Sequence, residues 1–249
     1  MRPETKSVYG PVWTRRFGWD LGINLLPLGR KLCTFDCVYC QYGSTPVVCR
    51  TNSMPVPDAL VAEWDLQVHS CESAGMGVHH TTVSGNGEPT MHPKFAAFAR
   101  HLVLWRNRRF PSMKLAILTN GYRLHDSTIR EAVELFDEPI VKLDAATSAK
   151  WLAINQPLVP FSVDRLIETL QQCNHVMLQT MFLKGMNDGP ADLEAWKAAI
   201  AKIKPREVQI YTVTRTTAIP DILPVRDADL LAIAEEATRE LGIPVRAYL

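Results

Sequence analysis

Strand-like and helix-like segments alternate along most of this chain, and this order restricts the folds open to it. Amphipathic helical patterns occur near residues 57–68, 93–105, 129–135, 163–173, 188–203 and 230–237. Short segments rich in apolar residues lie between them, at 79–85, 114–121, 139–145, 175–183 and 207–213. Strands separated by helices pair in parallel through crossover connections. We therefore expect an α/β fold with one mainly parallel sheet.

The number of units indicates part of a barrel. Counting from an early strand within 20–26, the chain has about six βα units, fewer than the eight of a complete TIM barrel, and 243–249 is a candidate final strand. We predict a single domain over 1–249 that forms a partial (β/α)6 TIM-like barrel, with a core at about 19–213 and a C-terminal helix and strand at about 227–249. A doubly wound sheet is the alternative. In both folds, ligands bind at the carboxyl ends of the strands.

Composition excludes several classes of protein. Of the 249 residues, 47% are hydrophobic and the net charge is only +1, which excludes an intrinsically disordered chain and a strongly basic nucleic-acid-binding protein. No apolar run approaches the ~18 residues of a membrane span, so no membrane partner is expected. The first residues lack the apolar segment of a secretory signal. The expected location is therefore the cytoplasm.

Half of the six cysteines fall on one short loop directly after the first candidate strand. Cys33, Cys37 and Cys40, within LCTFDCVYCQYG, follow a C-x3-C-x2-C spacing. Three thiolates can each bind one iron of a four-iron cluster and leave the fourth iron open, as a reactive metal site requires. The alternative is a structural zinc site with Cys49 as a fourth ligand. The remaining cysteines are expected to be core or loop thiols: Cys71 and Cys173.

This spacing, with an aromatic residue before the third cysteine, resembles the radical S-adenosylmethionine (SAM) superfamily, and SGNGEP (84–89) follows one βα unit later. The resemblance extends from about residue 8 to 213. YGPVWTRRFGWDLGINLLP, LTNG and LKGMND further resemble the subgroup of proteins similar to the wyosine tRNA-base synthases. Those synthases carry additional cysteines before the motif, whereas residues 1–32 here contain none. The chain therefore departs from the tRNA-modifying pattern.

The resemblance implies a [4Fe-4S] cluster bound by Cys33, Cys37 and Cys40, with SAM on the open iron. It implies reductive cleavage of SAM to methionine and a 5′-deoxyadenosyl radical, which abstracts hydrogen from a substrate. The cofactors carry this chemistry, and the protein supplies orientation and shielding. An electron donor such as ferredoxin or flavodoxin is implied as a partner. The other class of function considered is a non-catalytic zinc or iron–sulfur binding module.

Residues at the ends of two other strands are candidate SAM contacts. The resemblance implies that residues 84–89 bind the methionine amino group, with glycines giving close backbone approach and Glu88 adding a carboxylate. An ordinary glycine-rich turn with a solvated glutamate is the alternative. Tyr39 offers an aromatic face to adenine or to the cluster, and the superfamily tends to hold adenine where the sixth strand ends. The candidates are Tyr39, Gly85, Asn86, Gly87, Glu88, Tyr211, Thr212 and Val213.

Three further polar residues have two interpretations each. Asn120 is either a ligand contact or, with Gly121, a turn residue. Asp144 ends the fourth strand, where an acidic side chain either bonds ribose hydroxyls or caps the next helix. Gln179 is the polar exception in an apolar strand and needs a buried partner. That partner is either ribose or the SAM carboxylate, or else a backbone carbonyl.

The sequence leaves the substrate open among a small molecule, a peptide and RNA. Activation of a glycyl-radical protein is a further option, because such activases are also small partial barrels. The Arg15-Arg16 pair is more simply a solvated surface than an anion site. Arg215 follows the sixth strand, where an anionic substrate would come within its reach.

Overall fold

A single curled sheet forms the centre of the molecule in the computed structural model, which describes residues 3–46, 54–215, 217, 219 and 221–249. In the described residues the sheet has eight strands, and their order in the sheet is their order in the chain. The first two strands pair antiparallel and every later neighbour pairs in parallel. The strands are β1 (Val8–Thr14), β2 (Gly18–Ile23), β3 (His80–Val83), β4 (Lys114–Thr119), β5 (Glu138–Lys142), β6 (Met177–Phe182), β7 (Glu207–Thr212) and β8 (Val245–Tyr248).

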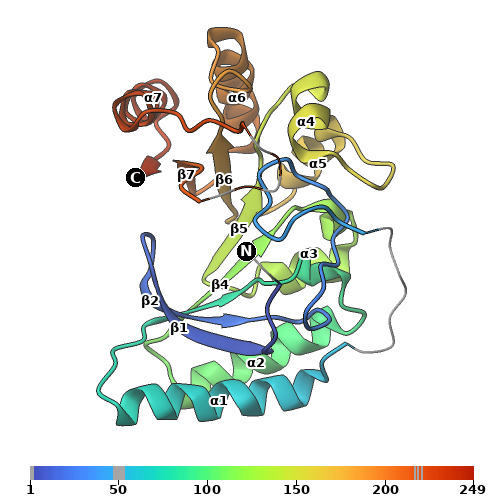
Figure 1. Cartoon of the computed structure of the whole chain (residues 1–249), viewed down its shortest axis with the longest axis vertical. Coiled ribbons are helices and arrows are strands. Elements are labelled where there is room, and N and C mark those ends of the chain that lie inside the picture. Colours follow the sequence, from blue (N-terminus) through green and yellow to red (C-terminus); the bar gives the residue numbers. More distant parts are fainter. Residues whose placement is uncertain (1–2, 47–53, 216, 218, 220) are drawn as a thin grey trace.

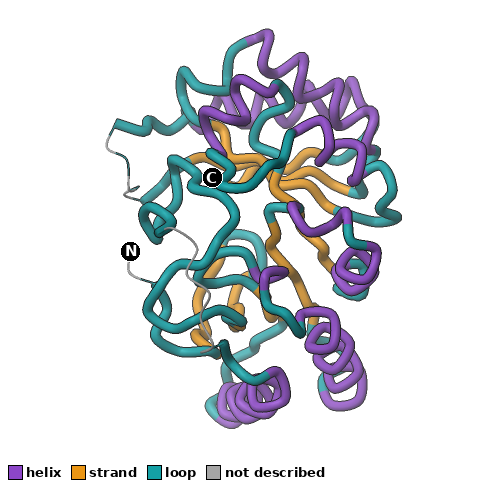
Figure 2. Tube along the Cα trace, turned by 90° about the vertical axis from the view of Figure 1, so that its right-hand side faces the viewer, coloured by secondary structure: helices purple, strands orange, loops and turns teal. Residues whose placement is uncertain are grey.

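The helices lie along the outer side of this sheet, as Figure 2 shows. Figure 1 places α1 and α2 at one end of the molecule and α6 and α7 at the other. An uninterrupted strand order with helices outside is the arrangement of a partial barrel, whereas a doubly wound sheet reverses its order at a switch point. The predicted fold class is confirmed. The helices are α1 (Pro57–Ser73), α2 (Phe95–Arg109), α3 (Ser127–Val133), α4 (Ser148–Asn155), α5 (Val163–Leu170), α6 (Pro190–Ile203) and α7 (Asp227–Leu241).

Tryptophans fix two of the helices to the outer face of the sheet. The Trp64 indole of α1 donates to the Thr81 hydroxyl on β3 at 2.9 Å, and the Trp196 indole of α6 donates to the hydroxyl of Thr180 on β6 at 2.9 Å. Both rings are fully buried in the main apolar core. Because side chains alternate along a strand, the residues next to each of these threonines on its strand point into the barrel.

A second, smaller apolar group fills one part of the barrel interior. Ala116, Ile140 and Met177 form it, with Phe17 packed against them. Phe17 lies in the turn between β1 and β2, and its ring stacks on His80 with 4.7 Å between centroids. The interior beyond this group is lined by polar and aromatic side chains. The fold therefore leaves the chemically useful space toward the carboxyl ends of the strands.

Two elements were not predicted. β1 contains Gly10 and Pro11, a pair that argues against a strand, but it lies at the sheet edge, where proline is tolerated. α4 has only eight residues, too few for a clear helical period. Among the described residues, no helix is both long enough and apolar enough to cross a membrane.

Candidate functional site

The cysteine loop is held between two segments of backbone. After β2, the amide of Leu32 donates to the carbonyl of Asn86 at 2.7 Å. On the other side of the loop, the Val38 amide donates to the Ile154 carbonyl at 2.9 Å. Isolated β-bridges form at the same two places, one parallel and one antiparallel. Protein hydrogen bonds therefore fix the path of residues 33–40 from both sides.

Two glycines beside this loop make room for neighbouring segments of the chain. Gly87 has φ +132°, and a Cβ there would lie 1.8 Å from the Leu32 carbonyl oxygen. Gly85 has φ +118°, and a Cβ there would lie 2.7 Å from the side chain of Asn24. We expected these glycines to admit a ligand. In the structure, the space beside each Cα is filled by protein: Gly87 lets Leu32, just before the cysteines, come close, and Gly85 lets the Asn24 side chain come close.

Amide groups point at two of the three thiols. The Phe35 backbone amide and the Asn120 side chain lie 3.5 and 3.8 Å from Cys33 Sγ, and Asn155 Nδ2 lies 3.5 Å from Cys37 Sγ. Burial raises the pKa of Cys33 and raises that of Cys37 to about 11. Metal binding removes these protons, and N–H donors stabilise the resulting thiolates. This donor set fits an iron–sulfur cluster.

The three sulfur atoms do not lie as close together as the ligands of one zinc ion. Ligands of one tetrahedral zinc lie about 3.8 Å apart, given Zn–S bonds of about 2.3 Å. In the part of the chain that the structure describes, the only three potential ligand atoms within 4.8 Å of one another belong to glutamates. The proposed fourth zinc ligand, Cys49, lies outside the described residues.

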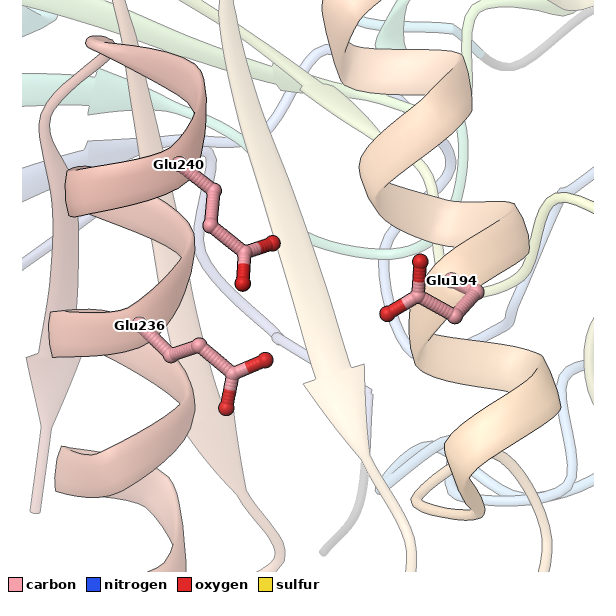
Figure 3. Close-up of side chains that lie close together, drawn as sticks. All are labelled: Glu194, Glu236 and Glu240. Carbon is pink, nitrogen blue, oxygen red and sulfur yellow. The ribbon is translucent and has the colours of Figure 1, made fainter.

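Those glutamates form an ion-pair network between α6 and α7. Figure 3 shows Glu194 on α6 facing Glu236 and Glu240 on α7. The ammonium of Lys197 lies 2.6, 2.9 and 2.7 Å from their carboxylates. The Lys197 ammonium therefore occupies the place that a metal ion would take among these carboxylates. The cluster joins two helices and is not a metal site.

Asp144 is the centre of a buried polar network beside the cysteine loop. Its carboxylate accepts hydrogen bonds from the Lys142 ammonium at 2.8 Å, Asn155 Nδ2 at 2.7 Å, the Met181 amide at 2.8 Å and the Tyr39 hydroxyl. The side chain is 1% exposed. No side chain caps α4, so Asp144 does not have the capping role considered for it. It joins the loop to β5, β6 and α4.

Lys142 extends this network to β7. Its ammonium donates to the Tyr211 hydroxyl at 3.0 Å and lies over the rings of Tyr211 and Tyr39, 4.7 and 5.2 Å from their centroids. Burial acts to lower the pKa of Lys142, but Asp144 and Tyr211 raise it overall. The sequence reading missed Lys142. Its signal was a charged residue two positions before Asp144, on the same face of a buried strand.

Glu88 is saturated by protein donors. It accepts the Thr90 amide and hydroxyl at 3.1 and 2.6 Å, the Thr119 hydroxyl at 2.7 Å and the Asn120 amide at 2.7 Å. Burial raises its pKa, and these hydrogen bonds oppose the shift. The alternative of a solvated glutamate is therefore wrong. Glu88 ties the end of β3 to the end of β4, where Asn120 meets Thr34 of the cysteine loop at 2.9 Å.

Asn86 has an equally complete set of protein partners. Its Nδ2 donates to the carbonyls of Glu4 and Pro27, both at 2.9 Å, and its Oδ1 accepts the Glu4 amide at 2.6 Å. This side chain holds the segment before β1 against the loop. Its backbone carbonyl, already noted, holds Leu32.

The expected adenine contacts line a cavity of about 490 Å³. Tyr39, Tyr211, Thr212 and Val213 all face it, together with Met181 and with residues of β1. The Thr212 hydroxyl is engaged elsewhere, because it donates to the Phe182 carbonyl at 2.8 Å. The structure thus brings one end of β7 and the cysteine loop to the same space.

Gln179 lies apart from this group. Its amide donates to Gln209 Oε1 at 3.2 Å, so its buried partner is a side chain and not the backbone carbonyl considered for it. Gln209 also accepts from Arg16 at 3.3 Å. Cys71 is buried in α1 and Cys173 is half-buried after α5, which agrees with core or loop thiols.

Asn155 is, like Lys142, a site residue that the sequence did not indicate. It is the last residue of α4, is 2% exposed, and contacts both Cys37 and Asp144 through one amide nitrogen. Its Oδ1 is buried and has no partner among the described residues. No motif marks this position, because its neighbours in space lie far away in the chain.

Comparison with known sequences gives one family match and several relatives. The model described as Radical SAM superfamily matches residues 31–237. A protein of Brachyspira hyodysenteriae named GTPase Obg is 28% identical over 86% of this chain and 31% of its own length. The UPF0026 protein slr1464 of Synechocystis sp. is 30% identical over 84% of this chain and 76% of its own. The chain thus spans less than a third of the first relative and about three quarters of the second.

Solved structures share the fold at low sequence identity. A radical SAM methyltransferase from Sphaerobacter thermophilus matches with TM-score 0.70 and 16% identity, over 92% of this chain and 65% of its own. TYW1 with a lysine-pyruvate adduct matches with TM-score 0.61 and 13% identity, over 88% and 73%. SuiB of Streptococcus suis bound to S-adenosylmethionine matches with TM-score 0.64 and 16% identity, over 91% and 50%.

Proposed function

The chain belongs to the radical SAM superfamily, whose cofactors are a [4Fe-4S] cluster and SAM, and we propose that Cys33, Cys37 and Cys40 hold the cluster. The observation that carries this proposal is a fixed loop in which two of the three thiols, Cys33 and Cys37, receive amide hydrogen bonds. When bound, the cluster and SAM supply an electron and a cleavable sulfonium, which yield methionine and a 5′-deoxyadenosyl radical able to abstract hydrogen. A reduced ferredoxin or flavodoxin is the proposed electron donor.

In this proposal the buried polar residues act by positioning. Asp144 holds the Tyr39 hydroxyl and the Lys142 ammonium, and so orients two groups beside the cavity. Glu88 fixes the amide of Asn120 and the turn after β3. The donors that saturate both carboxylates leave little capacity for direct bonds to a ligand. Their effect on SAM is therefore exerted through the backbone and side chains they hold.

The SAM contacts we propose follow from this arrangement. The backbone of residues 85–88 binds the methionine amino group, and Asn120 approaches the same end from β4. Tyr39 and the end of β7, with Tyr211, Thr212 and Val213, enclose the adenine. Asp144 acts on the ribose side of the site through the Tyr39 hydroxyl that it holds. Gln179, whose amide bonds Gln209, is not among the proposed contacts.

Anaerobic cluster reconstitution tests the proposal. Wild type is expected to bind about four iron atoms per chain and to absorb light at about 400 nm. With SAM and dithionite, it is expected to release 5′-deoxyadenosine. Cys33→Ala, Cys37→Ala and Cys40→Ala are each expected to reduce this product at least 100-fold. Cys173→Ala is the matched control and keeps wild-type yield. Fully loaded wild type that forms no 5′-deoxyadenosine would refute the proposal.

A further inference from the structure

Three arginines line the cavity without a carboxylate partner. Arg15, Arg16 and Arg215 all face it, and Glu4 is the only acidic side chain that does so. Residues 1–2, 47–53, 216, 218 and 220, which the structure leaves undescribed, contain no Asp or Glu. The arginines that form ion pairs in the described part are others: Arg106, Arg109, Arg123, Arg226 and Arg246. The cavity therefore carries an excess of positive charge.

Arg16 is the most buried of the three. Burial lowers its pKa, and among the described residues its guanidinium has one hydrogen bond, to the neutral Gln209 Oε1 at 3.3 Å, besides a contact over the Phe17 ring at 5.2 Å. A guanidinium has several N–H donors, and a desolvated cation is costly unless an anion accompanies it. Asp20 is the carboxylate that raises the pKa of Arg16, but the ion pairs of the described arginines do not include these two residues. The remaining donors of Arg16 call for an acceptor from a ligand.

The arginine pair is held in place across the open edge of the barrel. Arg15 Nη1 donates to the carbonyl of Tyr248 at 3.3 Å, and its Nη2 lies 3.5 Å from the Thr214 hydroxyl. These contacts fix the turn between β1 and β2 against β7 and β8. The guanidinium groups are thus positioned by the fold, which reduces the entropy lost on binding.

Arg16 bonds β7 at a point nearer the start of that strand than the proposed adenine contacts. Its partner Gln209 precedes Tyr211 by two residues on β7, which corresponds to about 7 Å along a strand. Tyr211 is linked through Lys142 and Asp144 to Tyr39 of the cysteine loop. A molecule anchored at Arg16 would therefore direct its body toward the loop.

We propose that Arg16, with Arg15 and Arg215, binds the anionic group of a small organic substrate, a carboxylate or a phosphate. The rest of the substrate is a planar, unsaturated body, because the aromatic side chains of the cavity outside the proposed adenine contacts include Tyr9, Trp13 and Tyr248. Adenine would take part of the cavity of about 490 Å³, and the remaining space suits a small metabolite. RNA would instead need an exposed basic groove. This inference rests on the proposed function, which defines the reacting end of the cavity.

Calorimetry with simple probes tests the site. Cluster-loaded protein with SAM is titrated anaerobically with phenyl phosphate, benzoate and benzyl alcohol. One of the two anions is expected to bind at least tenfold more tightly than the neutral alcohol, and the tighter one identifies the anionic group. Arg16→Gln is expected to weaken that binding at least tenfold. Arg108→Gln removes the same charge from an exposed position on α2 and leaves binding unchanged.

A second measurement does not depend on a variant. In wild type, the tighter anion is expected to protect Arg16 from modification by phenylglyoxal, read by peptide mass spectrometry, while Arg108 reacts at the same rate with and without it. Equal affinity for benzyl alcohol, unchanged binding by Arg16→Gln, or no protection of Arg16 overturns the inference. Single-stranded RNA that binds through Arg16 and is not displaced by either anion overturns the small-molecule assignment.

The outcomes for the two proposals are separable. Arg16→Gln is expected to retain the change that SAM causes in the electron paramagnetic resonance spectrum of the reduced cluster, and to retain unprimed 5′-deoxyadenosine formation. Loss of anion binding with these signals intact supports the anion site alone. Absence of both signals in wild type refutes the proposed function, whatever the anions do.

Discussion

Asp20 is a buried carboxylate on the inner face of β2 with incomplete partners. It accepts the Thr82 hydroxyl at 2.8 Å, and its Oδ1 has no partner among the described residues. Burial raises its pKa to about 6, although Thr82, His80 and Arg16 oppose the shift and Glu138 adds to it. A carboxylate that holds its proton more tightly when folded favours the folded state only at low pH.

This shift predicts a pH dependence of stability. The contribution of Asp20 is fully present below the unfolded pKa of 3.8 and is lost as pH rises through about 6. Asp20→Asn is therefore expected to be more stable than wild type at pH 7, by up to about 3 kcal/mol, and nearly equal to it near pH 4. Urea unfolding across this pH range measures the difference.

Asp229 provides a control, because its pKa is shifted in the opposite direction from that of Asp20. Asp229 is exposed and its pKa is lowered by hydrogen bonds from Arg226. Its contribution is present above the unfolded pKa and lost at lower pH, so Asp229→Asn should not gain stability at pH 7. Parallel stability curves for wild type and Asp20→Asn would show that the carboxylate is not destabilised by burial.

Single residues show where sequence reading of the site succeeds and where it stops. Cys33, Cys37 and Cys40 lie within eight residues of one another, so any loop keeps them close together. They could therefore be predicted from the sequence as one group of ligands. Asn155 and Lys142 join the site through contacts between distant segments, and no local pattern marks them. The hydrogen-bond partners of Glu88 could not be predicted from the sequence either. Its bonds with Thr90 and Thr119 depend on how the ends of β3 and β4 pack together.

At the scale of elements, the cysteine loop depends on a position without a side chain. A Cβ at Gly87 would overlap a backbone oxygen of Leu32, which no rotamer change can relieve. Gly87→Ala is therefore expected to lower the free energy of unfolding by more than about 3 kcal/mol and to reduce iron binding severely. Urea unfolding and iron content per chain measure the two effects.

Gly75 provides the matched control for this substitution. It also has positive φ, at +69°, but nothing lies within 4 Å of its Cβ position. Gly75→Ala should lose only about 1 kcal/mol from backbone strain and keep full iron content. If the two variants behave alike, the close approach of the loop to Gly87 is not what the site requires.

The elements themselves were predictable to different degrees. Strongly periodic segments such as 190–203 gave helices in the expected place, and each predicted parallel strand is present. β1 was missed because its proline is compatible only with an edge, and edge position is a property of the whole sheet. α4 was missed because a short helix stabilised by tertiary contacts carries little periodic signal.

At the scale of the whole molecule, the main apolar core contains residues of the first and the last strand. It extends from Val8 on β1 to Val245 on β8, and all described strands belong to one sheet. We therefore expect a single cooperative unfolding transition, which the prediction of one domain over 1–249 requires. Circular dichroism and tryptophan fluorescence should give the same urea midpoint.

Substitutions at opposite ends of the molecule test this expectation. Trp64→Phe and Trp196→Phe each remove a buried indole bond and should move the same midpoint downward in both signals. Trp13→Phe, at a ring that is 66% exposed, should leave the midpoint nearly unchanged. Two separate transitions, one shifted by Trp64→Phe and the other by Trp196→Phe, would divide the chain into independent units.

The bonds that hold the cysteine loop set an order of events in the cell. They come from residues 86–88 and 154–157, which are synthesised well after the cysteines. The binding site for iron and sulfur is therefore complete only when β3 has paired in the sheet and α4 has packed beside the cysteine loop. We expect the cluster-delivery machinery to act on a largely folded protein rather than on a nascent chain, in contrast to small domains that fold around their metal.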